Sequence, residues 1–232
     1  MNPDDRSTRT ITVVPSYPAP DFTELSNLAE EVSIVADELQ VDLVDGLFAP
    51  HASWPFTVGA VPPEDELQRL RELPASLQLE VDCMVQEPAQ YLDAIIATGA
   101  RRVILHYGSS DDYAYCLQHR IDNGYLMGLA LLPSIRLGEV RHLIDLFDYV
   151  QVMGIESVGA QGQPFARSAL DVIASIRTEW PQKTIAVDGA VNAETIPALV
   201  AAGANRLAPG SAIVRAPDRV VAYETLLRIA QG

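Results

Sequence analysis

The segments that decide the fold are LQLEVDCMV at 77–85, PAQYLDAIIAT at 88–98 and VILH at 103–106. The first and third are short, largely apolar runs typical of strands, and the middle one has the apolar period of a helix. Two strands joined through a helix run parallel in one sheet, because the chain must cross back before the next strand begins. The stretch therefore predicts a strand–helix–strand unit.

The same alternation continues in both directions. Strands are predicted at 10–14, 40–44, 126–132, 149–153, 184–187 and 205–208, and helices at 22–36, 64–73 and 217–230. About eight such units in 232 residues favour a single (β/α)₈ TIM barrel. An open doubly wound sheet usually has a GxGxxG turn after its first strand, and residues 15–20 are PSYPAP instead. We expect one barrel domain over 1–232, with 1–9 as a flexible N-terminal extension.

Composition narrows the possible functions. There are 16 basic and 31 acidic residues, a formal net charge of −15, which disfavours nucleic acid and membrane surfaces as partners. Lys183 is the only lysine, which excludes mechanisms that need an active-site lysine at another position, such as formation of a Schiff base. The two cysteines form no CxxC motif, and no run approaches about 18 apolar residues, so we expect a cytoplasmic protein.

Polar residues interrupt several of the apolar strands. They are Gln40, Asp42, Asp82, His106 and Asp188. A barrel places functional groups at the carboxyl ends of its strands, and carboxylates gathered there need a cation, a shared proton or basic partners. A single aspartate at the end of a strand more often forms a turn than a catalytic site. We interpret Asp45, which precedes Gly46, as such a turn residue. Together, Asp42, Asp82 and Asp188 predict a functional site.

Glycines follow the last two strands. Gly189 and Ala190 come after the seventh strand, and Gly210 and Ser211 after the eighth, where such barrels usually bind phosphate. The loop at 154–163, which contains Gly159 and Gly162, is either a mobile lid or an ordinary surface loop.

Among the histidines, His106 ends a strand and is either a metal ligand or a hydrogen-bonding partner of a ligand. His51, His119 and His142 are expected at the surface, because none of them has a partner at helical spacing.

Six motifs resemble those of the ribulose-phosphate 3-epimerase family along nearly the whole chain. They are PS at 15–16 with DF at 21–22, VDLVDGLFAP at 41–50, DCMV at 82–85 with EP at 87–88, the Gly-rich loop at 153–165, VDGAVN at 187–192 and GSAI at 210–213. Some positions depart from the family pattern. The third motif normally begins with histidine, and the Gly-rich loop is one residue longer here than in the family. Ala190 replaces the family's usual second glycine. LPS at 132–134 stands where the family usually has a polar residue before its proline.

The resemblance implies a metal-dependent barrel in which Asp42 and Asp188 act as general base and general acid at C3 of a sugar phosphate. The family metal is held by these aspartates and two histidines, and both histidine positions are changed here, to Gln40 and Asp82. A ligand set of Gln40, Asp42, Asp82 and Asp188 supplies only oxygen, which suits Mg²⁺ or Mn²⁺ more than Zn²⁺, if a metal is bound at all. The implied substrate- and phosphate-binding residues are Ser16, Met153, Gly159, Gly162, Gly189, Ala190, Gly210 and Ser211.

Two functions remain in competition. The favoured one is an epimerase that inverts C3 of a ketose phosphate such as ribulose 5-phosphate or xylulose 5-phosphate. The alternative is an inactive sugar-phosphate-binding protein that has lost its metal. A decarboxylase or aldolase is disfavoured because Lys183 precedes the seventh strand and falls at the wrong end of the barrel. The expected partners are a small-molecule ketose phosphate and further copies of the chain in a homo-oligomer. Phe48, Trp54 and Phe56 are either subunit contacts or substrate cover.

Overall fold

The computed structural model of the chain describes residues 10–59, 61–159 and 162–232. The N-terminal extension expected at 1–9 lies outside these residues.

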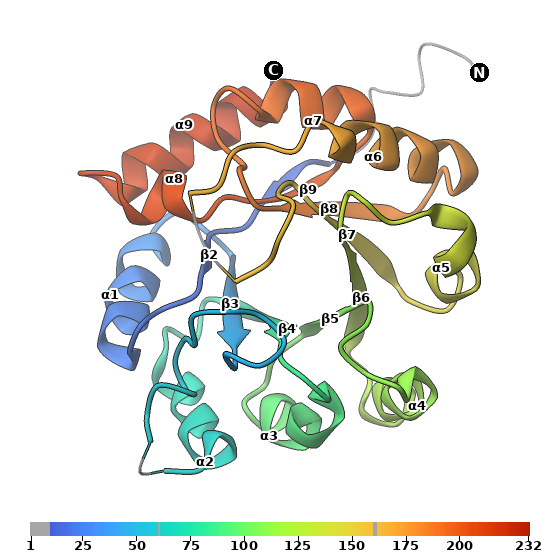
Figure 1. Cartoon of the computed structure of the whole chain (residues 1–232). Helices are drawn as coiled ribbons and strands as arrows, with labels where there is room; N and C mark the ends of the chain where they lie inside the picture. The colour runs from blue at the N-terminus through green and yellow to red at the C-terminus, as the bar shows by residue number, and fades with distance from the viewer. Residues whose placement is uncertain (1–9, 60, 160–161) are drawn as a thin grey trace.

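One sheet runs through the centre of the molecule, in the order β1-β9-β8-β7-β6-β5-β4-β3-β2 (Figure 1). All neighbouring strands are parallel, as the strand–helix alternation predicts. The strands are β1 (Thr12–Val13), β2 (Ser16–Tyr17), β3 (Glu38–Val44), β4 (Gln78–Met84), β5 (Arg102–His106), β6 (Leu126–Leu131), β7 (Tyr149–Met153), β8 (Thr184–Asp188) and β9 (Arg206–Ala208).

The first strand closes the sheet into a barrel, although it is split into β1 and β2. Thr12 pairs with Arg206 of β9, and Ser16 pairs with Gln40 of β3. Pro15 lies between the two pieces and has no N–H, so it can only accept, and its carbonyl accepts from Gln40 N at 2.8 Å. Residues 12–17 therefore bridge the last strand and the second, and the predicted (β/α)₈ barrel is confirmed.

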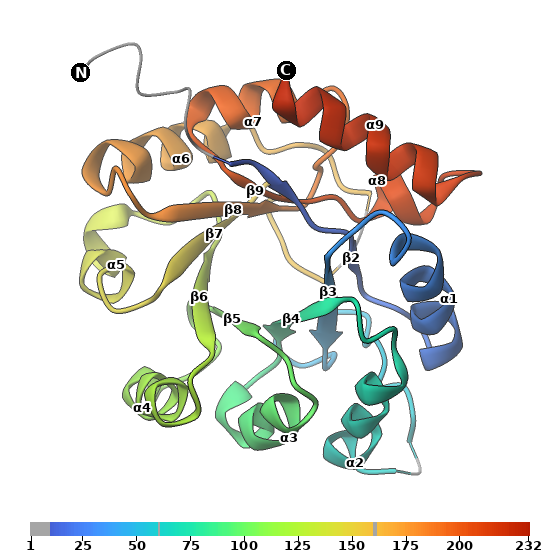
Figure 2. The same cartoon turned by 180° about the vertical axis from the view of Figure 1, so that it is seen from behind.

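Helices cover the outside of the ring (Figures 1 and 2). They are α1 (Phe22–Val32), α2 (Pro63–Leu67), η2 (Gln68–Glu72), η3 (Pro88–Tyr91), α3 (Leu92–Ala97), α4 (Tyr113–Asn123), α5 (Leu137–Ile144), α6 (Ser168–Glu179), α7 (Ile196–Ala202), α8 (Ser211–Val214) and α9 (Arg219–Gln231). The helices predicted at 64–73 and 88–98 are each divided into an α-helical and a 3₁₀ part. In the described part of the chain, no helix is both long and apolar enough to cross a membrane.

Strand residues alternate between two environments. Val41 and Leu43 face outward into the apolar layer beneath the helices, together with residues such as Leu25 and Ile95. Gln40 and Asp42 therefore face the barrel interior. The interior is polar at two levels, and this polar core positions the site.

The lower level is an ionic network at the amino end of the barrel. Arg206 Nη2 lies 2.8 Å from Glu38 Oε2 and 3.1 Å from Glu80 Oε1. The Tyr149 hydroxyl donates to Glu80 Oε2 at 2.8 Å. Burial acts to raise the pKa of Glu38, but the hydrogen bonds and charge of Arg206 hold it below its ordinary value. The network occupies the bottom of the barrel, and the aspartates singled out from the sequence lie above it, toward the carboxyl ends of the strands.

Candidate active site at the carboxyl end of the barrel

Strand register brings three aspartates together at the upper level of the interior. Asp42 on β3 pairs directly with Asp82 on β4, and Asp188 ends β8. Each contributes a carboxylate oxygen to a group in which all such atoms lie within 4.8 Å of one another. All three side chains are buried. The aspartates singled out from the sequence therefore form one cluster.

Gln40 lies under two of these aspartates. Its Nε2 donates to Asp42 Oδ1 at 2.8 Å and to Asp188 Oδ2 at 3.3 Å. Its Oε1 is buried and has no hydrogen-bond partner among the described residues. A buried acceptor without a donor is costly, so this oxygen is a candidate ligand for a cation.

Asp82 is held from both sides. His106 Nε2 lies 2.8 Å from Asp82 Oδ1, and Gln151 Nε2 donates to Asp82 Oδ2 at 2.9 Å. His106 is thus a hydrogen-bonding partner of Asp82, one of the two roles expected for it, and Phe48 packs against its ring with centroids 5.7 Å apart. Gln151 was missed in the sequence analysis. The signal was present, because Gln151 interrupts the apolar strand at 149–153 just as Gln40 interrupts the strand at 40–44.

The electrostatics of the cluster favour proton uptake. Burial, followed by the charges of Asp188 and Asp82, raises the pKa of Asp42 well above its ordinary value. Burial and the charge of Asp82 raise the pKa of Asp188 to about 7, against the hydrogen bond that its carboxylate accepts from Gly189 N. Without a cation, the cluster retains protons near neutral pH.

A pocket of about 500 Å³, including the part open to solvent, lies directly above the cluster. It is lined by Ser16, Pro18, Asp42, Met84, Met153, Ile155, Gly159, Gly162, Asp188, Gly189, Ala190, Val191, Gly210 and Ser211. All eight residues expected to contact substrate or phosphate are in this lining, as are both expected acid–base aspartates. Gln40, Asp82 and His106 lie below the pocket and do not line it.

The wall formed by the loops after β7 and β8 is backbone-rich and tightly packed. Gly154 N donates to the carbonyl of Asp188 at 2.6 Å, and a Cβ atom on Gly154 would lie only 2.0 Å from the carbonyl oxygen of Gly189. Ala190 has a positive φ of 54°, and its carbonyl accepts from Thr195 Oγ1 at 2.8 Å. Contacts from both loops therefore hold this strained turn against the pocket.

The loop at 154–163, interpreted from the sequence as either a mobile lid or an ordinary surface loop, packs at the pocket edge. A Cβ atom on Gly159 would lie 2.7 Å from the carbonyl oxygen of Pro50, so the loops after β7 and β3 touch at this point. Arg215, which follows α8, brings Nη1 to 3.3 Å from the position of a Cβ atom on Gly162. Residues 160 and 161 lie outside the described part, and the mobility of the loop stays a prediction.

Three further expectations concern residues around the site. Asp45 forms a turn as expected, since its Oδ1 accepts from the backbone N of Leu47 and Phe48 at 2.8 and 2.9 Å. Trp54 is neither a subunit contact nor substrate cover, because it is 1% exposed and packs against Phe22 in the core. Phe56 is partly buried and packs edge-on against Tyr91.

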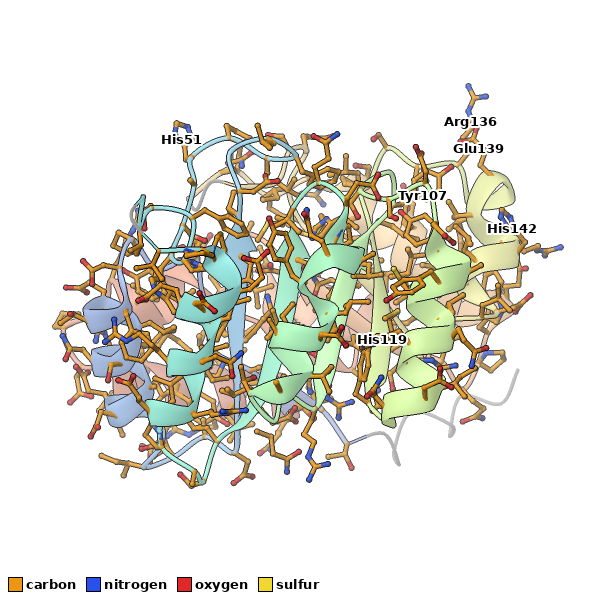
Figure 3. The ribbon with its side chains drawn as sticks, turned by 90° about the horizontal axis from the view of Figure 1, so that it is seen from below. His51, Tyr107, His119, Arg136, Glu139 and His142 are labelled. Atoms are coloured by element: carbon orange, nitrogen blue, oxygen red, sulfur yellow. The ribbon has the colours of Figure 1, made fainter. Side chains whose placement is uncertain are left out.

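The expectation for His119 was wrong. Its side chain is buried, with Nδ1 3.0 Å from the Tyr125 hydroxyl and Nε2 2.9 Å from Asp93 Oδ1. Figure 3 shows it between helices and away from the edge where His51 and Tyr107 lie. The Asp93 carboxylate and the tyrosine hydroxyl satisfy both ring nitrogens, which allows the imidazole to be buried. His51 and His142 are exposed as expected.

Comparison with solved structures supports the fold. A 3-hexulose-6-phosphate synthase from Salmonella typhimurium superposes with a TM-score of 0.71 at 14% identity, covering 95% of this chain and 98% of that one. KGPDC from Streptococcus mutans superposes with a TM-score of 0.73 at 10% identity, covering 95% of this chain and 97% of that one.

Sequence comparison is more specific. A ribulose-phosphate 3-epimerase from Bacillus subtilis (strain 168) is 32% identical over 216 residues, covering 90% of this chain and 94% of that protein. One from Schizosaccharomyces pombe is 29% identical over 217 residues, covering 90% of each. The family model described as "Ribulose-phosphate 3 epimerase family" matches residues 12–214, which is most of the chain. This chain belongs to the ribulose-phosphate 3-epimerase family.

Proposed function

We propose that this protein inverts C3 of a ketose phosphate such as ribulose 5-phosphate, giving xylulose 5-phosphate. One observation carries the proposal. Asp42 and Asp188 come from β3 and β8 and line the same pocket. Burial and neighbouring carboxylates raise the pKa of Asp42 well above its ordinary value and that of Asp188 to about 7. Groups that gain and lose protons near neutral pH are suited to general acid–base catalysis.

The two aspartates would divide the proton transfers between them. One carboxylate takes the C3 proton, and the electron pair left on C3 moves toward the adjacent C2 carbonyl, giving an enediolate. The other, in its protonated form, returns a proton to C3 from the opposite face. The protonation states of the pair are then exchanged, so the reverse reaction uses the same groups with their roles swapped.

A divalent cation fits the residues at the floor of the pocket and directly below it. The three clustered carboxylates and the unpartnered Gln40 Oε1 are the groups that would hold it. These donors are all oxygens, so we propose Mg²⁺ or Mn²⁺ rather than Zn²⁺. When bound, the cation would supply positive charge that stabilises the negative charge developing on the sugar oxygens.

The phosphate would lie at the opposite wall of the pocket. Gly189, Ala190, Gly210 and Ser211 line that wall, and the amide of Gly189 already donates to Asp188 Oδ1, so the amides of the other three are the proposed donors. Backbone amides bind phosphate oxygens without a side-chain charge. Ser16 and Met153 would contact the sugar between the phosphate and the aspartates.

A second candidate is a sugar-phosphate-binding protein without catalysis. The observation in its favour is that Gln40 donates to both Asp42 and Asp188, which partly satisfies these carboxylates without any cation. Such a protein would bind ketose phosphates and turn none over.

The deciding experiment is proton NMR of ribulose 5-phosphate with the protein in D₂O, with chelator, Mg²⁺, Mn²⁺ or Zn²⁺ added in turn. We expect deuterium at C3 and the appearance of xylulose 5-phosphate with Mg²⁺ or Mn²⁺. Asp42→Asn and Asp188→Asn should each lower the exchange rate by about 10²- to 10⁴-fold or more. Asp122→Asn, on the exposed face of α4, is the matched control. Tight binding without exchange under every condition would favour the second candidate.

Three broader properties belong to the same proposal. We propose that 1–232 act as one domain, that the protein works in the cytoplasm, and that it forms a homo-oligomer with no nucleic-acid or membrane partner. Light scattering coupled to size-exclusion chromatography measures the assembly.

A further inference from the structure

Gln151 is a long polar side chain placed deep in the barrel wall. It is fully buried, and its register partners on both sides are alanines, Ala130 on β6 and Ala186 on β8. Two small neighbours leave room for the amide to reach across the interior to Asp82 on β4. The placement of Gln151 therefore depends on the residues around it as well as on its own identity.

The amide of Gln151 points its nitrogen at the carboxylate of Asp82. Its Nε2 donates to Asp82 Oδ2 at 2.9 Å and lies 3.8 Å from the sulfur of Met153, which lines the pocket. Its Oε1 is buried without a partner among the described residues, as is Oε1 of Gln40. Two buried amides thus donate to the carboxylate cluster, and each leaves an oxygen without a donor.

Asp82 is the least exposed of the three aspartates, at 0% against 4% for Asp42 and 8% for Asp188. Its side chain is completely buried, and it lies beside Asp42 in register. Three carboxylates this close repel one another. The donors Gln151 and His106 occupy opposite oxygens of Asp82, which fixes the carboxylate plane and offsets part of its charge.

We propose that Gln151 is a positioning residue that holds Asp82 in the orientation needed for a divalent cation and thereby sets the cation affinity of the site. The inference rests on the proposed function, since it assumes that the aspartate cluster binds a cation. Partners that orient a metal ligand typically contribute 10- to 100-fold to metal affinity. Gln151 acts through Asp82 and does not line the pocket.

The test is Mn²⁺ binding measured by electron paramagnetic resonance, with no substrate present. Gln151→Met keeps the length of the side chain and removes the donor, and Gln151→Leu is the second variant if the first does not fold. We expect Mn²⁺ to bind about 10-fold or more weakly in these variants. In an Asp82→Asn background the same substitution should change the affinity little, because Gln151 then has no carboxylate to hold.

Tyr149→Phe is the matched control. Tyr149 lies on the same strand and its hydroxyl also donates to a buried carboxylate, Glu80, but in the lower network. Its removal should lower thermal stability and leave Mn²⁺ affinity unchanged. Unchanged affinity in Gln151→Met, or equal weakening in Tyr149→Phe, would overturn the inference. Absence of Mn²⁺ binding by the unmodified chain would instead contradict the proposed cation, and with it the premise.

Discussion

Asp42 and Asp188 lie on different strands and accept hydrogen bonds from the same nitrogen, Nε2 of Gln40, at 2.8 and 3.3 Å. The amide couples the two groups proposed to exchange protons with substrate. It also occupies a position where the family resemblance implies a histidine. A substitution of Gln40 should therefore affect both the acid–base pair and the choice of cation.

Gln40→His should change the cation preference. An imidazole nitrogen is a better ligand for Zn²⁺ than an amide oxygen, so Zn²⁺ binding should tighten relative to Mg²⁺. Competition between the two ions, followed by isothermal titration calorimetry, gives the ratio of Kd values. Gln118→His, on the exposed side of α4, controls for a new histidine elsewhere. An unchanged ratio would contradict the placement of Gln40 among the ligands.

With chelator present, the stability of the protein should depend on pH through the titration of Asp188. The folded state raises its pKa from 3.8 to about 7, so between these values the folded chain holds a proton that the unfolded chain has lost. Stability from this group is present below about pH 4 and is lost as pH rises toward 7. Asp188→Asn removes the titration. The free energy of unfolding, measured in urea, should therefore increase in the variant relative to the unmodified chain as pH rises. A difference independent of pH would contradict this.

Arg215→Gln should weaken substrate binding. The chain carries a net charge of −15 and the pocket contains two aspartates, so a dianionic substrate is repelled except where a cation lies close. Arg215 places its guanidinium beside Gly162 at the pocket edge. We expect KM to rise roughly fivefold with kcat unchanged, since an exposed charge pair contributes up to about 1 kcal/mol. Arg141→Gln, on the exposed face of α5, should leave KM unchanged. A fall in kcat alone would argue against this role.

Arg206→Met should destabilise the protein without altering the site. Arg206 is buried and pairs with both Glu38 and Glu80. Its loss leaves these two carboxylates with the more exposed Arg102 as their remaining cationic partner among the described residues. Breaking a buried pair in this way costs about 3–5 kcal/mol. Urea denaturation measures the loss. Arg219→Gln removes a pair with the exposed Glu31 and should cost less than about 1 kcal/mol. Equal effects of the two substitutions would show that the lower network contributes little.

The sequence by itself determined the fold and most of the site. Local apolar periodicity encodes each strand and each helix. Their alternation specifies a parallel sheet, because each helix carries the chain back before the next strand begins. Asp42, Asp82 and Asp188 stood out because a carboxylate in an apolar strand is costly unless it has partners. The glycines at 189 and 210 stood out because their motifs lie at the carboxyl ends of the last strands.

Only the tertiary structure decided which residues meet across the barrel. Gln151 and Asp82 are separated by 69 positions, and their hydrogen bond depends on register, on strand tilt and on the alanines that flank Gln151. The burial of His119 depends in the same way on Asp93 and Tyr125, which approach it from different segments. Local periodicity places each side chain on a face of its own element. The partners that make a buried polar group stable come from elsewhere in the chain, so their identity is a property of the closed barrel.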